Sequence, residues 1–256
     1  MKLFLDTAKV EDVEQRISTD LIAGITTNPT LIKKSGKFPD DVYHEFNRLG
    51  ITDISMEVVG ESCEELFERA VHLTKEFGDI ATIKLPCTVD GLKACKRLAN
   101  LNIRVNVTLV FSVSQAILAA LAGATYVSPF IGRIDDNSFD GLDLIKDISK
   151  VYKNSYSKTY ILAASIRDVH SVGKAFAYGA DICTIPPSVF DKMYNHVLTS
   201  AGLCQFNEDA LNFGKNVWRH SLLRTVRNNP HVPLLIVKNS EGLTRSLLRN
   251  SLNLRR

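Results

Sequence analysis

Short apolar segments alternate with amphipathic segments along most of this chain, and this alternation limits the folds open to it. Eight segments have the apolar and β-branched character of buried strands, namely residues 2–5, 23–26, 53–58, 81–85, 104–108, 126–130, 160–165 and 181–185. Strands that alternate with helices predict a mainly parallel sheet. Eight such units within the first 214 residues favour an α/β fold of the closed (β/α)8 TIM-barrel type over an open doubly wound sheet.

The intervening segments have the spacing and the stop signals of helices. Residues 63–77 place apolar side chains among glutamates at helical spacing, and residues 92–98 and 112–122 show the same pattern. Gly123 and Gly179 lead from such segments directly into strands, as helix-ending glycines commonly do. We therefore expect one barrel over residues 1–214, followed by a basic C-terminal helical extension over residues 215–256.

Polar residues gather at the C-terminal ends of the predicted strands. They are Asp6, Thr26, Asn28, Glu57, Lys84, Asn106, Thr108, Ser128, Ser165 and Arg167. Taken singly, most are better explained as turns or helix caps: Asp6 before the helix near residue 10, Asn28 before Pro29, and Ser165 before the next helix. In a barrel, however, these strand ends converge on one mouth, where active sites lie. So many polar residues at one mouth predict a site.

Lys84 stands inside the apolar run 81–85, which Pro86 ends. Burying an ammonium ion is costly, so a lysine in such a strand is usually paired with an anion or kept neutral for chemistry. A neutral amine can attack a carbonyl carbon and form a Schiff base. Two simpler interpretations are a structural ion pair and an edge-strand lysine whose amine reaches water.

Composition excludes several classes of protein. With 45% hydrophobic and 23% charged residues, the chain is ordinary for a globular protein, and no apolar run reaches the roughly 20 residues of a membrane helix. Asp6 comes too early for a signal peptide. Five scattered cysteines without a CxxC pair, and six histidines without metal-ligand spacing, predict neither disulfides nor a metal site. We therefore expect a cytoplasmic protein. The sequence contains neither GxGxxG nor GxxxxGK[ST], so no nucleotide-binding motif is present.

Six stretches of the sequence resemble the transaldolase family, specifically its small, short-chain branch. They are FLDTA (4–8), GITTNPTLI (24–32), IKLP (83–86), NVTLVFS (106–112), GATYVSPFIGRIDD (123–136) and ASIR (164–167). The resemblance runs from the N-terminus to roughly residue 215. It implies a (β/α)8 barrel, a covalent Schiff-base mechanism, and neither a metal nor an organic cofactor.

The resemblance also implies the catalytic roles. Lys84 would condense with the C2 carbonyl of a ketose phosphate to give an imine that acts as an electron sink. Asp6 would be the general base that removes the C4 hydroxyl proton as the C3–C4 bond breaks. Glu57 and Thr108 would hold a water for the proton transfers of imine formation and hydrolysis.

The substrate-binding residues implied by the resemblance are Thr26, Asn28, Asn106, Ser128, Phe130, Arg133, Ser165 and Arg167. The side-chain amides of Asn28 and Asn106 and the hydroxyl of Ser128 would bind the hydroxyls of the three-carbon enamine. Thr26 would support these three residues. The two arginines, with the hydroxyl of Ser165, would bind the substrate phosphate. An arginine after a strand is otherwise usually solvated or salt-bridged.

Two other functions compete with transaldolase. The sister activity, fructose 6-phosphate aldolase, uses the same lysine but releases free dihydroxyacetone; that branch typically has Gln, Tyr and Lys at the positions of Glu57, Phe130 and Arg167. A tyrosine hydroxyl could position a hydrolytic water, whereas phenylalanine leaves that spot dry. A barrel kept only as a binding or scaffold protein would be suggested by loss of Lys84 or Asp6, and both are present.

The C-terminal region departs from the family pattern. From Lys215 onward it carries nine basic residues and one acidic residue, Glu241. Such a tail can bind nucleic acid, but no aromatic interleaving supports that, and we expect neither nucleic-acid nor membrane partners. Leu211, Trp218, Leu222 and Val226 predict an apolar helix face, with a short strand at 234–237 and a helix at 247–252. Family members often form rings, so we expect a homo-oligomer, a pentamer or decamer.

Overall fold

The computed structural model of the protein describes residues 1–212. The chain divides into two compact units, the first comprising Met1–Asn195 and the second beginning at His196. The first unit holds the barrel, and the described part of the second consists of His196 and helix α11 (Val197–Asn212). The elements predicted within residues 215–256 lie outside the described residues, as does most of the predicted apolar face that begins at Leu211. The barrel boundary at residue 214 stays a prediction.

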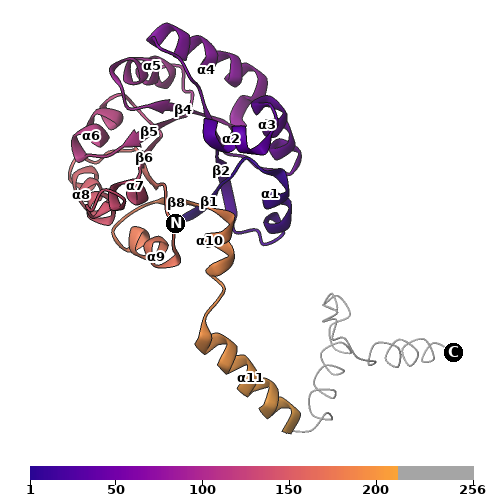
Figure 1. Cartoon of the computed structure of the whole chain (residues 1–256). Helices are drawn as coiled ribbons and strands as arrows, with labels where there is room; N and C mark the ends of the chain where they lie inside the picture. The colour runs from indigo at the N-terminus through magenta and orange to yellow at the C-terminus, as the bar shows by residue number, and fades with distance from the viewer. Residues whose placement is uncertain (213–256) are drawn as a thin grey trace, which may run out of the picture. The chain divides into compact units, whose positions relative to one another are not determined.

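The first unit is built on a closed barrel of eight parallel strands (Figure 1). The strands are β1 (Lys2–Asp6), β2 (Ile22–Thr26), β3 (Ile54–Glu57), β4 (Ala81–Pro86), β5 (Val105–Val110), β6 (Tyr126–Pro129), β7 (Tyr160–Ala163) and β8 (Ile182–Ile185). Each strand pairs with its neighbour in the sequence, and β1 pairs with β8 to close the ring. The predicted (β/α)8 barrel is confirmed, because the sheet has no edge strand.

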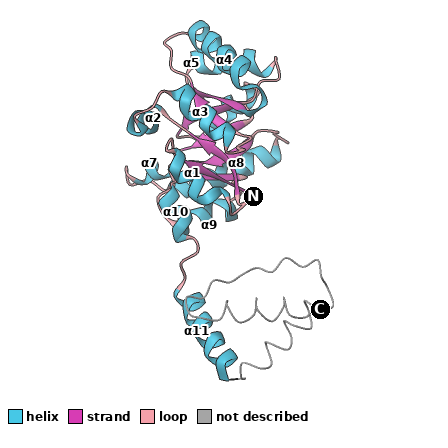
Figure 2. Ribbon diagram, turned by 90° about the vertical axis from the view of Figure 1, so that its right-hand side faces the viewer, coloured by secondary structure: helices cyan, strands magenta, loops and turns pink. Residues whose placement is uncertain are grey.

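Helices cover the outside of the strands in the views of Figures 1 and 2. They are α1 (Val10–Ile17), α2 (Pro29–Ser35), α3 (Pro39–Arg48), α4 (Cys63–Phe77), the 3-10 turn η1 (Gly78–Ile80), α5 (Val89–Ala99), α6 (Val113–Leu121), α7 (Ile131–Asp135), α8 (Gly141–Asn154), α9 (Val169–Ala177) and α10 (Pro187–Lys192). Side chains of Ser62, Thr88 and Ser112 cap α4, α5 and α6 by accepting hydrogen bonds from backbone amides. Gly123 and Gly179 have φ angles of 85° and 102°, which glycine adopts without strain at helix ends.

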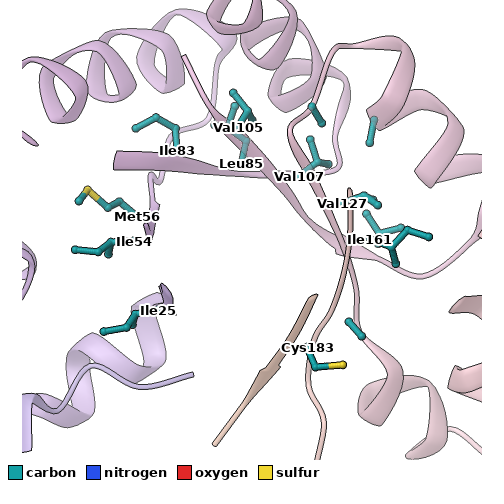
Figure 3. Close-up of a cluster of buried hydrophobic side chains, with 14 of the residues drawn as sticks. Ile25, Ile54, Met56, Ile83, Leu85, Val105, Val107, Val127, Ile161 and Cys183 are labelled. Carbon is teal, nitrogen blue, oxygen red and sulfur yellow. The ribbon is translucent and has the colours of Figure 1, made fainter. Parts of the chain in front are cut away.

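Alternate side chains of the strands serve two different cores. One set packs between the strands and the helices and includes Ile25, Ile54, Met56, Ile83, Leu85, Val105, Val107, Val127, Ile161 and Cys183 (Figure 3). The other set, Phe4, Tyr126, Leu162, Ala164 and Ile182, forms a separate cluster. Since successive residues of a strand point to opposite faces, this second set fills the interior of the barrel.

A polar network surrounds Asp53 at the N-terminal end of the barrel. The Asp53 carboxylate accepts hydrogen bonds from Thr82 Oγ1 (2.8 Å) and Tyr126 Oη (2.6 Å), and it pairs with Arg104 at 3.0 Å. Burial, and then the neighbouring charge of Asp53, raises the pKa of Tyr126, so its hydroxyl stays a donor. These bonds satisfy a buried carboxylate far along the strands from the predicted site.

Two strands end two residues away from the prediction, and the other six end within one residue of it. Strand β7 stops at Ala163, and the next residues reach Ser165 in a left-handed conformation with φ 59°. Strand β5 continues to Val110, with an irregular register between Val107 and Val110 and φ 58° at Leu109. Non-glycine residues in this region are strained, and such strain concentrates at functional sites. Within residues 1–212, no helix combines the length and the apolar character that crossing a membrane requires.

Candidate active site

A pocket opens at the C-terminal ends of the barrel strands. It is lined by Asp6, Thr26, Asn28, Lys84, Ser128, Phe130, Arg133, Ala164, Ser165 and Thr184. Eight of these were predicted from the sequence, and they come from five different strands and the loops that follow them. The mouth predicted from the strand ends is therefore a real concavity, built as barrel active sites are.

Lys84 is buried, with 4% of its side chain exposed. Its amine donates a hydrogen bond to the backbone carbonyl of Thr27 at 2.9 Å and lies 2.9 Å from Glu57 Oε2. Glu57 and Lys84 are register partners on β3 and β4, so the sheet itself sets this contact. The edge-strand interpretation is wrong, because β4 lies between two strands of a closed ring. The amine is paired, and it lines the pocket.

Asp6 ends β1 and shares the pocket with Lys84. Burial raises the pKa of its carboxyl above the ordinary 3.8, while the charge of Lys84 and a hydrogen bond from Thr26 oppose the rise and Glu57 adds to it. Thr26 Oγ1 donates that bond at 2.8 Å. Asp6 does not cap α1; Thr7 Oγ1 instead accepts from the Lys9 amide and donates to Asp12. The carboxylate is therefore not used as a helix cap, and it lines the pocket while it accepts the hydrogen bond from Thr26.

Asn106 and Ser128 form a chain of hydrogen bonds on the two strands that follow the strand of Lys84. Ser128 Oγ donates to Asn106 Oδ1 at 2.7 Å, and Asn106 Nδ2 donates to Ser55 Oγ at 3.1 Å. The chain fixes which way the Asn106 amide points. Ser128 lines the pocket, whereas Asn106 is fully buried and is the register partner of Lys84 on β5.

Thr108 is buried in β5, opposite Pro86 of β4. Its hydroxyl has no hydrogen-bond partner among the described residues. Nearly all buried polar atoms in proteins are paired with protein or water, so this hydroxyl has bonding capacity left for a ligand or a water. The strained residue Leu109 follows directly.

Asn28 has a structural role as well as a place in the pocket. Its side chain caps α2 by accepting a hydrogen bond from the Leu31 amide at 2.9 Å. Its Oδ1 is thus engaged, and the amide nitrogen remains available to face a ligand. Ser165 does not cap the helix that follows it, because Asp168 does so for α9.

The two predicted phosphate-binding arginines lie in different situations. Arg133 lines the pocket, with its guanidinium carbon 4.9 Å from the centre of the Phe130 ring. Arg167 does not line the pocket; its guanidinium forms a two-bond pair with the Asp136 carboxylate. That pairing lowers the pKa of Asp136. Gly132 directly precedes Arg133, and an added Cβ there would be 2.1 Å from the Ser165 carbonyl oxygen and 3.0 Å from Arg167 Nε.

Sequence reasoning missed some contributors to the site. Thr184, in β8, lines the pocket and contacts Thr26, yet no residue of β8 was among the candidates. A single threonine in the apolar run Ile182-Cys183-Thr184-Ile185 was the available signal. The Thr27 carbonyl, which accepts from Lys84, carries no side-chain signal at all. Within residues 1–212, no group of three or more histidine, cysteine or acidic side chains is arranged to hold a metal ion.

The sequence is similar to a family model and to several known proteins. The family model described as Transaldolase/Fructose-6-phosphate aldolase matches residues 3–223. A probable transaldolase of Paracoccus denitrificans is 46% identical over 217 residues, which is 85% of this chain and 100% of the relative. One of Nitrosopumilus maritimus is 47% identical over 210 residues, covering 82% of this chain and 94% of the relative. One of Caulobacter vibrioides is 46% identical over 217 residues, with 85% and 100% covered.

Proposed function

Because the chain belongs to the transaldolase/fructose-6-phosphate aldolase family, we propose that it is a transaldolase acting through a Schiff base on Lys84. It transfers a dihydroxyacetone unit from a ketose phosphate, sedoheptulose 7-phosphate or fructose 6-phosphate, to glyceraldehyde 3-phosphate or erythrose 4-phosphate. This is a reaction of the non-oxidative pentose phosphate pathway. The observation that carries the proposal is a buried amine, 2.9 Å from Glu57, in one pocket with Asp6.

Formation of the imine begins when the Lys84 amine gives up a proton and attacks the C2 carbonyl carbon of the ketose. Glu57 is the closest carboxylate to that amine, at 2.9 Å, and it can take the proton. The carbinolamine then loses its hydroxyl as water, and Glu57 returns a proton to the departing oxygen. The Thr108 hydroxyl, which has no hydrogen-bond partner within residues 1–212, can form the second hydrogen bond to that water.

Carbon–carbon cleavage uses Asp6. Its ionised carboxylate takes the proton of the C4 hydroxyl, the C3–C4 electron pair moves toward the protonated imine, and an aldose phosphate leaves. The product on Lys84 is an enamine, which attacks the aldehyde carbon of the acceptor. Asp6 then returns its proton to the new alkoxide. A carboxyl whose pKa is raised by burial is a better base than an ordinary one.

The enamine has to remain bound while one aldose leaves and another enters. Asn28 and Ser128 face the pocket with free bonding capacity for its hydroxyls. Asn106 acts with them from its buried place behind Ser128. The ring of Phe130 at the same wall presents no hydroxyl that could orient a water, so the intermediate is kept from hydrolysis.

Phosphate binding falls to Arg133, Ser165 and Arg167. Arg133 and Ser165 already line the pocket, and a guanidinium with a hydroxyl suits a phosphate dianion. Arg167 is held by Asp136, so a substrate phosphate would have to draw this guanidinium away from a carboxylate. The exchange is feasible because both side chains of the pair are exposed, and exposed ion pairs contribute little to stability.

The decisive experiment combines trapping with an acceptor requirement. Borohydride reduction with fructose 6-phosphate should attach the sugar covalently to the wild-type protein and to Lys93→Ala, whose lysine is exposed on α5. Lys84→Ala should trap nothing while keeping its fold by circular dichroism. Turnover should require added erythrose 4-phosphate or glyceraldehyde 3-phosphate. Release of free dihydroxyacetone without an acceptor would instead identify an aldolase.

We also propose that the enzyme is a cytoplasmic homo-oligomer, a pentamer or decamer. Helix α11 exposes Leu198, Leu203 and Phe206, and an apolar helix surface is a suitable contact for another copy of the chain. All five cysteines lie in the described residues as free thiols, which supports a reducing compartment. Light scattering that gave a monomer at micromolar concentration would contradict the oligomer.

A further inference from the structure

The strand β8 contributes a second hydroxyl to the site through Thr184. Thr184 Oγ1 lies 2.6 Å from Thr26 Oγ1, and Thr26 Oγ1 lies 2.8 Å from Asp6 Oδ1. Strand β1 separates β8 from β2 in the sheet, so the two threonines reach each other from either side of the strand that carries Asp6. Both are 2% exposed.

The direction of these bonds follows from counting protons. A threonine hydroxyl has one hydrogen to donate, and an ionised carboxylate can only accept. Thr26 therefore donates its single hydroxyl hydrogen to Asp6. In the contact between the two hydroxyls, Thr184 is then the donor and Thr26 the acceptor. A hydroxyl that accepts a bond becomes a stronger donor, by about 10–30% per bond in condensed phases. Thr184 thus reinforces the bond that Thr26 makes to the carboxylate.

We propose that Thr184 is a positioning residue, which acts through Thr26 to hold the Asp6 carboxylate in its ionised, proton-accepting form. This inference rests on the proposed function, in which Asp6 is the base of the cleavage step. The other groups that bear on Asp6 are Lys84 from β4 and Glu57 from β3, and Arg133 lines the same pocket. The contribution of Thr184 is distinct because it is uncharged and disappears when its hydroxyl alone is removed.

The first test measures Asp6 directly, without substrate. The carbon-13 signal of the Asp6 carboxyl, assigned by its loss in Asp6→Asn, is followed as a function of pH in the wild type and in Thr184→Val. We expect its midpoint to rise by roughly 0.5 pH in Thr184→Val and to stay in place in Thr184→Ser. Thr82→Val is the matched control, because it removes a buried threonine hydroxyl at the other end of the barrel, and it should leave the midpoint unchanged.

The second test uses the transfer reaction. The acid limb of the pH profile of kcat/KM should move upward with the carboxyl midpoint, with about a threefold loss on the acid side for Thr184→Val and little loss at alkaline pH. In a Thr26→Val background, Thr184→Val should add nothing further. An unmoved midpoint in Thr184→Val, or full additivity of the two changes, overturns the inference. If Thr184→Val does not fold, Thr184→Ala takes its place under the same criteria.

The two tests separate the inference from the proposed function. If the wild type traps no sugar and transfers none, the proposed function fails, while the carboxyl titration still decides whether Thr184 acts on Asp6. If transfer is observed and the midpoint does not move in the valine or alanine variant, only the role of Thr184 is overturned.

Discussion

Glu57 and Lys84 face each other across neighbouring strands, with Glu57 Oε2 2.9 Å from Lys84 Nζ. Their side chains are 17% and 4% exposed, so the ammonium ion is compensated inside the barrel while the carboxylate stays partly exposed. The same contact supplies a proton acceptor next to the proposed nucleophile. The Glu57–Lys84 pair therefore both compensates the buried charge and supplies the proton acceptor of the proposed reaction.

Changing Glu57→Gln should slow formation of the imine while leaving the barrel folded. The amide retains an oxygen that can accept from Lys84, but it cannot take the proton of the amine. We expect the rate of borohydride-trappable adduct formation to fall about 100-fold or more. The control is Glu64→Gln, an exposed glutamate at the start of α4. Wild-type trapping rates in Glu57→Gln would remove this residue from the mechanism.

Changing Asp6→Asn should abolish transfer and yet stabilise the protein at neutral pH. Burial raises the pKa of the folded carboxyl above the 3.8 of the unfolded chain, so between these values only the folded protein retains the proton. The free energy of unfolding of the wild type therefore falls as pH rises through that window, and the cost persists at pH 7. Urea unfolding at pH 3.5 and pH 7 measures the difference. A variant equally or less stable than the wild type at pH 7 would contradict the expected cost.

Gly132→Ala should weaken the binding of phosphorylated substrates. An added Cβ would lie 2.1 Å from the Ser165 carbonyl, so Ser165 and Arg167 would have to move. The KM for erythrose 4-phosphate should rise about tenfold or more, as for loss of a hydrogen bond to a charged group, with less effect on an unphosphorylated acceptor. Gly173→Ala on α9, where an added Cβ meets nothing within 4 Å, is the control. An equal rise in KM for the phosphorylated and the unphosphorylated acceptor would show that Gly132→Ala does not act through phosphate binding.

Asp53→Asn should destabilise the barrel without altering its chemistry. The change leaves Arg104 without its carboxylate and disturbs the hydrogen bond that Tyr126 makes to Asp53. We expect a loss of about 2 kcal/mol in the free energy of unfolding and a kcat/KM within about twofold of wild type at 25 °C. Asp79→Asn, an exposed side chain near the same end, should change neither. A large loss of kcat in folded Asp53→Asn would show that the two ends of the barrel are coupled.

The fold and most of the pocket could be predicted because they depend on local patterns. Alternating apolar strands and amphipathic helices imply parallel strands, and parallel strands bring their C-terminal ends together. Asp6, Thr26, Lys84 and Ser128 were therefore predicted as neighbours although up to 122 residues separate them along the chain. Residues 215–256 lie outside the described residues, and their predicted elements stay predictions.

Contacts made across the barrel could not be predicted, because they depend on register and on backbone atoms. No sequence pattern specifies that the Thr27 carbonyl accepts from Lys84, that Arg167 pairs with Asp136, or that Asn28 both caps a helix and faces the pocket. Thr184 was not predicted because a single hydroxyl in an apolar strand gives no sign of its partner. Its contact with Thr26 forms only because the barrel closes and places β8 next to β1. Residue types and their spacing decided which groups meet at the mouth of the barrel. Only the closed sheet, through its stagger and its strained turns, decided which atoms bond to which.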